Sequence, residues 1–258
     1  MKPHPRSVFI TGASSGLGVA LARQYAMQGA ILGLFARRRA ELDALAASFP
    51  AGSAAVYTGD VRDPAALADA AADFIARFGV PEIVIANAGI SQGALTEHAE
   101  DLPTFRAIFD TNVVGIVNTF QPFVAAMNTA RRGALVGIAS IAGFRGLPGS
   151  GAYSASKAAA ITYLESLRVE LHDTGVAVVT VCPGYISTPM TAKNPYPMPF
   201  VLSAEEAARR IVRAIGRRKR FHVLPWPMAI VGCALRMLPR PLYDALFAHA
   251  PRKPRRSG

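Results

Sequence analysis

Short apolar runs alternate with amphipathic segments over most of the chain. The runs are hydrophobic at nearly every position and rich in Val, Ile, Leu and Ala, which is typical of strands buried on both faces. They predict seven strands, at residues 7–13, 30–36, 54–58, 82–86, 133–140, 176–182 and 221–224.

The segments between these runs repeat their apolar residues with helical spacing. Leu17, Ala20 and Leu21, for example, share one helix face. Pro64 stands at a helix start, where proline is tolerated, and Ser203 with Glu206 forms a capping box. The pattern predicts helices at residues 16–28, 38–49, 64–78, 102–130, 152–173 and 203–215.

This alternation predicts an α/β fold. Strands that alternate with helices form a doubly wound parallel sheet (Rossmann fold), here of about seven strands with helices on both faces. Ligands bind such sheets outside the carboxyl ends of the strands. We expect one nucleotide-binding and catalytic domain over residues 1–216, with a substrate lid at 189–202, and an extension over 217–258 that packs on this domain or faces a membrane.

Composition supports a globular protein, with 51% hydrophobic and 17% charged residues. Cys182 and Cys233 lie in apolar surroundings without metal-ligand spacing, so we expect buried free thiols in a reducing compartment and no metal site. Residues 1–7 do not resemble a signal peptide. These features predict a cytoplasmic protein, with contact to the inner membrane surface left open.

The net charge of +11 is concentrated in the last fifty residues. Residues 209–258 hold 13 of the 28 Lys and Arg residues and one of the 17 acidic residues. The remainder of the chain is therefore close to neutral. Such asymmetry favours an anionic partner for the end of the chain alone.

A glycine-rich turn joins the first predicted strand to the first predicted helix. Glycines allow a diphosphate to approach the backbone, and the helix N-terminus attracts its negative charge. The strand–turn–helix context favours nucleotide binding over a merely tight turn. The candidate residues are Gly12, Ser14, Ser15, Gly16, Leu17 and Gly18.

The end of the second predicted strand bears on the choice of cofactor. An acidic residue there binds a ribose 2′-hydroxyl, whereas arginine accommodates a 2′-phosphate. Arg37 and Arg38 occupy this place, and no acid follows before Glu41. Three successive arginines can also be a solvated helix start, although cations there oppose the helix dipole. The pattern favours NADP (NADPH) over NAD, with Arg37 first and Arg38 second.

Tyr153 and Lys157 are four residues apart, so they share a helix face. A neighbouring ammonium favours the phenolate, and a serine hydroxyl such as that of Ser140 can hold a carbonyl oxygen beside the phenol. This is a proton-transfer site for reducing a ketone or oxidising an alcohol. The Tyr–Lys spacing alone is weak evidence for such a site, and the predicted nucleotide site in the same chain strengthens it.

Taken together, these motifs resemble the short-chain dehydrogenase/reductase family, classical type. The resemblance covers roughly residues 7–190 and is specific in order and spacing. It is carried by T-G-x-x-x-G-x-G at 11–18, N-A-G at 87–89, Asn112, Ser140 and Y-x-x-x-K at 153–157.

The resemblance implies a role for each matching position. Tyr153 would be the general acid in reduction, Lys157 would hold the nicotinamide ribose and lower the Tyr153 pKa, and Ser140 would orient the carbonyl. Asn112 would anchor a proton-relay water. Further cofactor contacts are implied at Asp60, Val61, Asn87, Ala88, Gly89, Pro183, Gly184, Ile186 and Thr188. Homodimers or homotetramers are usual in the family.

Three segments are candidate walls of a substrate site: 90–98, 141–151 and the lid at 189–202. Their apolar residues fit a hydrophobic or lipid-like carbonyl compound, unless they merely pack the lid down. Arg145 and Lys193 leave room for an anionic group.

The extension contains an apolar stretch at 228–238, about half the length that spans a bilayer. It either lies in a membrane interface, with Trp226 at the headgroups, or packs against the protein or another subunit. No nucleic-acid module is recognisable, so we expect no nucleic-acid partner.

These features predict an NADP-dependent oxidoreductase that interconverts a ketone or aldehyde and an alcohol. Two alternatives stay open: a broad reductase of small carbonyl compounds, and a catalytically silent NADP-binding sensor or scaffold. The intact Tyr–Lys–Ser–Asn set argues against the silent protein.

Overall fold

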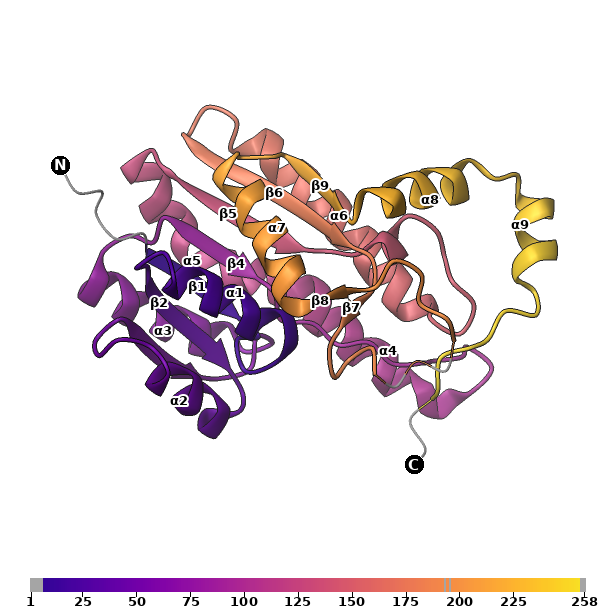
Figure 1. Cartoon of the computed structure of the whole chain (residues 1–258), viewed down its shortest axis with the longest axis horizontal. Helices are drawn as coiled ribbons and strands as arrows, with labels where there is room; N and C mark the ends of the chain where they lie inside the picture. Colours follow the sequence, from indigo (N-terminus) through magenta and orange to yellow (C-terminus); the bar gives the residue numbers. More distant parts are fainter. Residues whose placement is uncertain (1–6, 193, 195, 256–258) are drawn as a thin grey trace.

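The computed structural model describes residues 7–192, 194 and 196–255. Its centre is a parallel sheet of seven strands in the order β3-β2-β1-β4-β5-β6-β9 (Figure 1). The strands are β1 (Ser7–Thr11), β2 (Ile31–Ala36), β3 (Ala54–Thr58), β4 (Ile83–Ala86), β5 (Gly133–Ile138), β6 (Val176–Pro183) and β9 (Phe221–Leu224). The predicted doubly wound sheet is confirmed.

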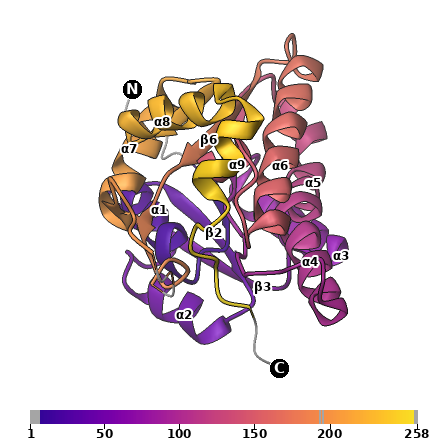
Figure 2. The same ribbon diagram turned by 90° about the vertical axis from the view of Figure 1, so that its right-hand side faces the viewer.

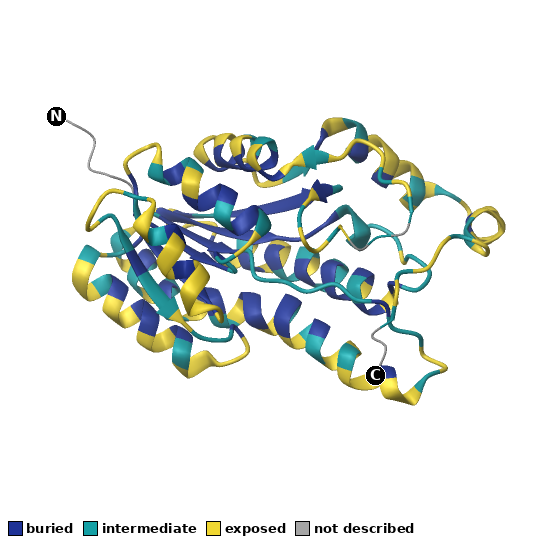
Figure 3. Cartoon of the chain, turned by 60° about the horizontal axis from the view of Figure 1, so that its bottom comes forward, coloured by how far each residue is buried: buried dark blue, intermediate teal, exposed yellow. Residues whose placement is uncertain are grey.

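Helices cover both faces of this sheet, because every strand is apolar on both sides. One core packs the sheet against α1 (Gly16–Ala26), α2 (Arg39–Ala47) and α7 (Ala204–Gly216). The other packs it against α3 (Pro64–Phe78), α5 (Gly115–Ala130) and α6 (Gly151–Glu170). Figure 3 shows the strands buried between layers of helices whose outer faces are exposed.

The predicted elements agree closely with the observed ones. Strands β3 and β9 and helix α3 have the predicted bounds, and Ser203 caps α7 by accepting a hydrogen bond from the Glu206 amide at 3.1 Å. β9 pairs with β6 and completes the sheet, so a strand of the main domain lies beyond residue 216. The chain leaves the sheet only after Leu224.

One predicted helix differs from the structure. Residues 102–130 form α4 (Leu102–Phe109), a π-helical turn η2 (Asp110–Val114) and α5 in place of one continuous helix. The polar side chain of Asn112 lies buried in this turn and bonds to backbone outside the helix. π-turns are rare and often mark functional sites.

Beyond the sheet, the chain forms α8 (Trp226–Met237) and α9 (Arg240–Phe247) at one end of the molecule, and then returns toward the loop that follows β4 (Figures 1 and 2). Much of this arm is solvent-exposed (Figure 3). The expectation of two buried thiols is correct for Cys182 and wrong for Cys233, which is exposed on α8. None of the described helices has both the length and the apolar character needed to cross a membrane.

Candidate active site

A cleft opens at the carboxyl ends of the central strands. Its lining combines the glycine-rich turn after β1, the ends of β2 to β6 and residues of α6. Eighteen of the nineteen residues predicted to bind cofactor line it: Gly12, Ser14, Ser15, Gly16, Leu17, Arg37, Arg38, Asp60, Val61, Asn87, Ala88, Gly89, Tyr153, Lys157, Pro183, Gly184, Ile186 and Thr188.

The turn after β1 owes its shape to glycine. Gly12 and Gly16 have φ angles of 68° and 52°, in the left-handed region that favours glycine. Gly18 does not line the cleft, and a Cβ on it would lie 2.2 Å from the Gly12 carbonyl oxygen. Asn87 fixes the turn from β4 by donating to the Thr11 carbonyl at 3.0 Å.

Helix α1 begins directly behind this turn. Its N-cap residue Ser15 has an extended backbone and makes no side-chain capping bond. The first amides of α1 therefore lack a side-chain acceptor from their own cap and are available to an anion in the cleft. These amides, together with the glycines that let a ligand approach the backbone, fit the diphosphate of a dinucleotide.

The charged residues near β2 lie at one end of the cleft. Arg38 turns back over the glycine-rich turn and donates to the Ser14 carbonyl at 3.0 Å and its hydroxyl at 3.1 Å. The Arg37 side chain is 67% exposed, with its guanidinium 3.9 Å from the Asp60 carboxylate. Asp60 forms its shorter ion pair with Arg62 at 2.7 Å, and this hydrogen-bonded pair lowers the pKa of the Asp60 carboxyl.

Ser140, Tyr153 and Lys157 meet at the other end of the cleft. Burial raises the pKa of the half-buried Tyr153 phenol, and a hydrogen bond with Ser140 opposes this rise. The Lys157 ammonium lies 5.8 Å from the Tyr153 ring centroid and donates to the Ile138 carbonyl at 2.7 Å. Burial lowers the pKa of Lys157 to about 8, so the group is still largely protonated at neutral pH.

Asn112 lies behind this group and does not line the cleft. Its side-chain carbonyl accepts from the Ile90 amide at 2.8 Å, and its amide donates to the Ile90 carbonyl at 2.9 Å and to Ser156 Oγ at 3.0 Å. Because Ile90 follows the Asn-Ala-Gly motif, Asn112 joins the π-turn to the wall of the cleft and to α6.

Five lining residues were not predicted: Ala36, Gly59, Thr111, Ile138 and Ala139. Thr111 precedes Asn112, and the other four stand at or next to the ends of β2, β3 and β5; their nearness to predicted residues is the signal that identifies them. Ile90 belongs to the predicted wall 90–98, and Pro189, Met190 and Thr191 belong to the predicted lid 189–202. Thr191 Oγ1 accepts the Thr188 backbone N–H at 3.1 Å.

Arg145 and Lys193 were the two cations considered for binding an anionic group of the substrate. Arg145 is used structurally: it stacks at 4.3 Å on the Tyr243 ring and donates to the Leu235 and Leu238 carbonyls at the end of α8, both at 3.1 Å. Lys193 lies outside the described residues. Among the described residues, no cluster of three or more His, Cys, Asp or Glu side chains is placed to bind a metal ion.

The parallel sheet, its glycine-rich turn and the Ser–Tyr–Lys group define a nucleotide-dependent oxidoreductase. Residues 6–197 match the family model described as short chain dehydrogenase. This match covers most of the chain, and the protein belongs to the short-chain dehydrogenase/reductase family.

Curated relatives and solved structures agree. An uncharacterized oxidoreductase of Myxococcus xanthus is 40% identical over 246 residues, covering 93% of this chain and 95% of the relative. Dehydrogenase/reductase SDR family member 7B of Bos taurus is 33% identical over 270 residues, covering 97% and 82%. A short chain dehydrogenase of Burkholderia cenocepacia, solved in complex with NADP, superimposes with a TM-score of 0.82 at 26% identity, covering 97% of this chain and all (100%) of that one.

Proposed function

We propose that this protein is an NADP-dependent oxidoreductase that reduces a hydrophobic or lipid-like ketone or aldehyde to an alcohol. The observation that carries the proposal is the meeting of Ser140, Tyr153 and Lys157 in the cleft that also contains the glycine-rich turn. A nucleotide bound there supplies the hydride, and the protein supplies position and a proton.

The three side chains divide the work on the substrate. Ser140 donates its hydroxyl to the carbonyl oxygen and holds it beside the phenol. Tyr153 then gives its proton to that oxygen as negative charge develops. The Lys157 ammonium favours the resulting phenolate and hydrogen-bonds the nicotinamide ribose. Asn112 acts behind them: by holding Ile90 and Ser156 it fixes the wall beside Lys157 and anchors a proton-relay water.

The remaining residues of the cleft hold the nucleotide. The turn from Gly12 to Gly18 and the amides of α1 receive the diphosphate. Asp60 and Val61 contact the adenine, and Asn87, Ala88 and Gly89 line its ribose. The end of β6 and the segment after it hold the carboxamide through Pro183, Gly184, Ile186 and Thr188. All of these residues except Ala13 and Gly18 of the turn line the cleft, which supports the assignment.

The preference for NADP rests on the arginines after β2. Arg37 and Arg38 line the cleft, and no carboxylate occupies the first positions after the strand, where one would bind a 2′-hydroxyl. Arg37 is exposed and only loosely paired with Asp60, so its guanidinium is available to a phosphate. The relative from Burkholderia cenocepacia was solved with NADP, which supports the same choice.

The proposal of an apolar substrate rests on the segment after β6. Pro189 and Met190 line the cleft, and the rest of the lid carries exposed apolar side chains at Phe200 and Val201. The lid is bounded by a two-residue parallel pairing of β7 (Ile186–Ser187) with β8 (Leu202–Ser203). Such a segment closes over an apolar chain while leaving the nucleotide half of the cleft unchanged.

We also propose a cytoplasmic homo-oligomer that contacts anionic membrane surfaces through α8 and α9. These helices expose Trp226, Ile230 and Met237, with side chains of Arg236 and Arg240 nearby in sequence. Flotation with anionic and neutral liposomes tests the contact. The triple change to Ser at Trp226, Ile230 and Met237 should abolish flotation with anionic liposomes, whereas equal partitioning of both proteins would contradict it.

The competing function is a silent NADP sensor. A sensor could use Lys157 to hold the nucleotide, but it has no need of a proton donor such as the Tyr153 phenol beside Ser140. NADPH consumption with a panel of carbonyl compounds of graded chain length decides between the two. The enzyme should consume NADPH in proportion to alcohol formed; tight NADPH binding without turnover on any compound would favour the sensor.

A further inference from the structure

The chain after α9 returns to the catalytic cleft. Residues 251–255, here called the C-terminal strap, lie along the loop that follows β4 (Figures 1 and 2). The Gly93 amide donates to the Pro254 carbonyl at 3.1 Å, and Gly93 pairs with Arg255 as a parallel bridge. A Cβ on Gly93 would lie 2.3 Å from the Lys253 carbonyl oxygen. The strap therefore packs closely against one predicted wall of the substrate site.

The strap also touches the second wall. A Cβ on Gly149 would lie 2.8 Å from Arg252 Cβ, and the φ of Gly149 is +71°. The two walls themselves meet in a bridge between Ala94 and Ser150. The strap thus spans the two segments, 90–98 and 141–151, that border the substrate end of the cleft.

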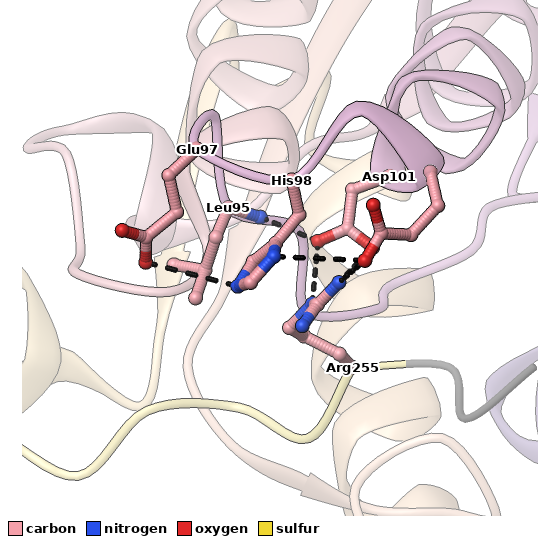
Figure 4. A network of polar contacts seen from close by, with 6 residues as sticks. Leu95, Glu97, His98, Asp101 and Arg255 are labelled. Atoms are coloured by element: carbon pink, nitrogen blue, oxygen red, sulfur yellow. Dashed lines mark hydrogen bonds and ion pairs between the residues drawn. The ribbon is translucent and has the colours of Figure 1, made fainter.

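Arg255 anchors this arrangement (Figure 4). Its guanidinium donates to both carboxylate oxygens of Asp101, at 2.7 and 3.2 Å, and to Glu100 at 2.8 Å. The Asp101 side chain is only 7% exposed and also accepts the Leu95 amide at 2.8 Å. A two-point pair to a buried carboxylate fixes both position and orientation.

Because Arg255 is fixed two positions further on, the side chain of Lys253 is held near Tyr153. Its ammonium donates to Ser91 Oγ at 2.7 Å and lies 5.8 Å from the Tyr153 ring centroid. Ser91 follows the Asn-Ala-Gly motif by two positions and is the neighbour of Ile90, which lines the cleft. The structure therefore brings a cation within reach of a compound whose carbonyl rests on Tyr153.

Lys253 and Arg255 of the strap differ in the charge of their hydrogen-bond partners. Arg255 has two carboxylate partners, whereas within the described residues no carboxylate pairs with Lys253. The side chain is half-buried, and this burial lowers its pKa. A partly desolvated ammonium whose polar partner is a neutral hydroxyl has unused capacity for an anion.

We propose that Lys253 and Ser91 form a subsite for the acidic group of the carbonyl substrate, a carboxylate or a phosphate a few bonds from the reacting carbon. This proposal rests on the proposed function and narrows its substrate class to amphipathic keto acids or phosphorylated ketones. The lid then covers the apolar part, and the strap holds the charged part.

The test compares each acid with a neutral partner. Calorimetry of the NADP-saturated protein uses 4-oxodecanoate against its methyl ester, and hydroxyacetone phosphate against hydroxyacetone. The wild type should bind at least one of the two acids more tightly than the matching neutral compound. A preference for 4-oxodecanoate would identify the acidic group as a carboxylate, and a preference for hydroxyacetone phosphate would identify it as a phosphate. Lys253→Met should lower the affinity for that acid by about 10- to 100-fold, as expected for loss of a charge-assisted hydrogen bond. The affinity for the neutral compound should change by less than about threefold.

Two control variants make the result specific. Arg252→Met removes the same charge from the adjacent, exposed position and should leave the preference for the acid intact. Lys253→Arg should restore most of it. Thermal melting of each variant excludes a folding defect as the cause.

The outcomes separate the subsite from the proposed function. A wild type that binds neither acid more tightly than its neutral partner, or a Lys253→Met variant that weakens both equally, would overturn the subsite. NADPH consumption on the methyl ester is measured in parallel. Absence of turnover on every compound would overturn the proposed function, while a Lys253-dependent preference in binding would still support the subsite.

Discussion

Two lysine ammonium groups lie 5.8 Å from the centroid of the Tyr153 ring, and they come from contrasting regions of the molecule. Lys157 stands on α6, one turn from Tyr153, and its buried side chain lines the cleft. Lys253 arrives on a strap near the end of the chain, held by contacts with residues more than 100 positions away.

The difference separates a site built on regular elements from one built on a connecting segment. The region of Lys157 sits on regular elements whose spacing fixes the geometry of proton transfer. The region of Lys253 sits on an irregular segment that packs against the loop after β4. In many α/β enzymes the residues that perform the chemistry are held by a rigid scaffold, while the residues that recognise the substrate lie on connecting segments.

The sharpest way to break this comparison is to remove the phenol hydroxyl. Tyr153→Phe keeps the ring that both lysines approach and deletes the proton donor, so kcat for ketone reduction should fall by about 10² to 10⁴-fold. NADPH affinity, measured by fluorescence titration, should change little. Activity within tenfold of the wild type would remove Tyr153 from its role.

The burial of Lys157 can be tested by the pH dependence of stability. Its pKa falls from 10.5 to about 8 on folding, so between those values the unfolded chain binds more protons and stability rises with pH. Relative to Lys157→Met, which lacks this titration, the wild type should gain roughly 2–3 kcal/mol in the free energy of unfolding between pH 7.5 and 10. Urea unfolding measures it, and a constant difference would contradict the burial cost.

The cofactor end of the cleft is tested by its arginines. The double change of Arg37 and Arg38 to Gln should lower the ratio of kcat/KM for NADPH over NADH by about 10- to 100-fold, since each charge-assisted bond to a phosphate is strong. Arg39→Gln is the matched control, because Arg39 pairs with Asp43 on α2 at 2.8 Å and does not line the cleft. An unchanged ratio in the double variant would remove both arginines from 2′-phosphate recognition.

The strap can be displaced without touching the nucleotide site. Gly93→Ala places a Cβ against the Lys253 carbonyl oxygen, whereas Gly146→Ala adds one where nothing lies within 4 Å. We expect kcat/KM for the preferred acid to fall by about tenfold in Gly93→Ala alone, with KM for NADPH unchanged, because the charge-assisted contact is lost. Equal kinetics in both variants would show that the strap has no part in recognition.

The smallest effect is expected on global stability when the strap anchor is weakened. Arg255→Gln keeps an N–H donor beside the Asp101 carboxylate, which is 7% exposed and still accepts the Leu95 amide, so the urea midpoint of unfolding should change little. Hydrogen exchange at the Gly93 amide should nevertheless accelerate, because that amide bonds to the strap. Unchanged exchange would mean that other contacts hold the strap.

The sequence was sufficient for the sheet, most helices and the cleft residues. Continuous apolar runs predicted the strands and period-3.6 patterns predicted the helices. Short motifs at strand ends meet at one edge of a parallel sheet, whatever the conformation of the loops. It was not sufficient for the π-turn at Asn112, which depends on bonds to Ile90 across the fold. Arg145 was misjudged for the same reason, since its partners at the end of α8 lie about 90 residues away.

Lys253 carried no signal in the sequence. It lies in a run of basic residues that reads as a solvated tail, and its partner Ser91 is 162 residues earlier. The anchoring of Arg255 and the close approach at Gly93, both across the fold, place this segment near Tyr153.

The most direct test of the central claim follows a single hydrogen atom. NADPH carrying deuterium at the transferable position, prepared separately in each stereochemical form, is mixed with protein and the responsive carbonyl compound, and the alcohol is analysed by mass spectrometry. We predict deuterium on the carbinol carbon from one form only, and its loss in Tyr153→Phe. Tight binding of the labelled nucleotide with no deuterated alcohol from either form would contradict the assignment of this cleft as an active site.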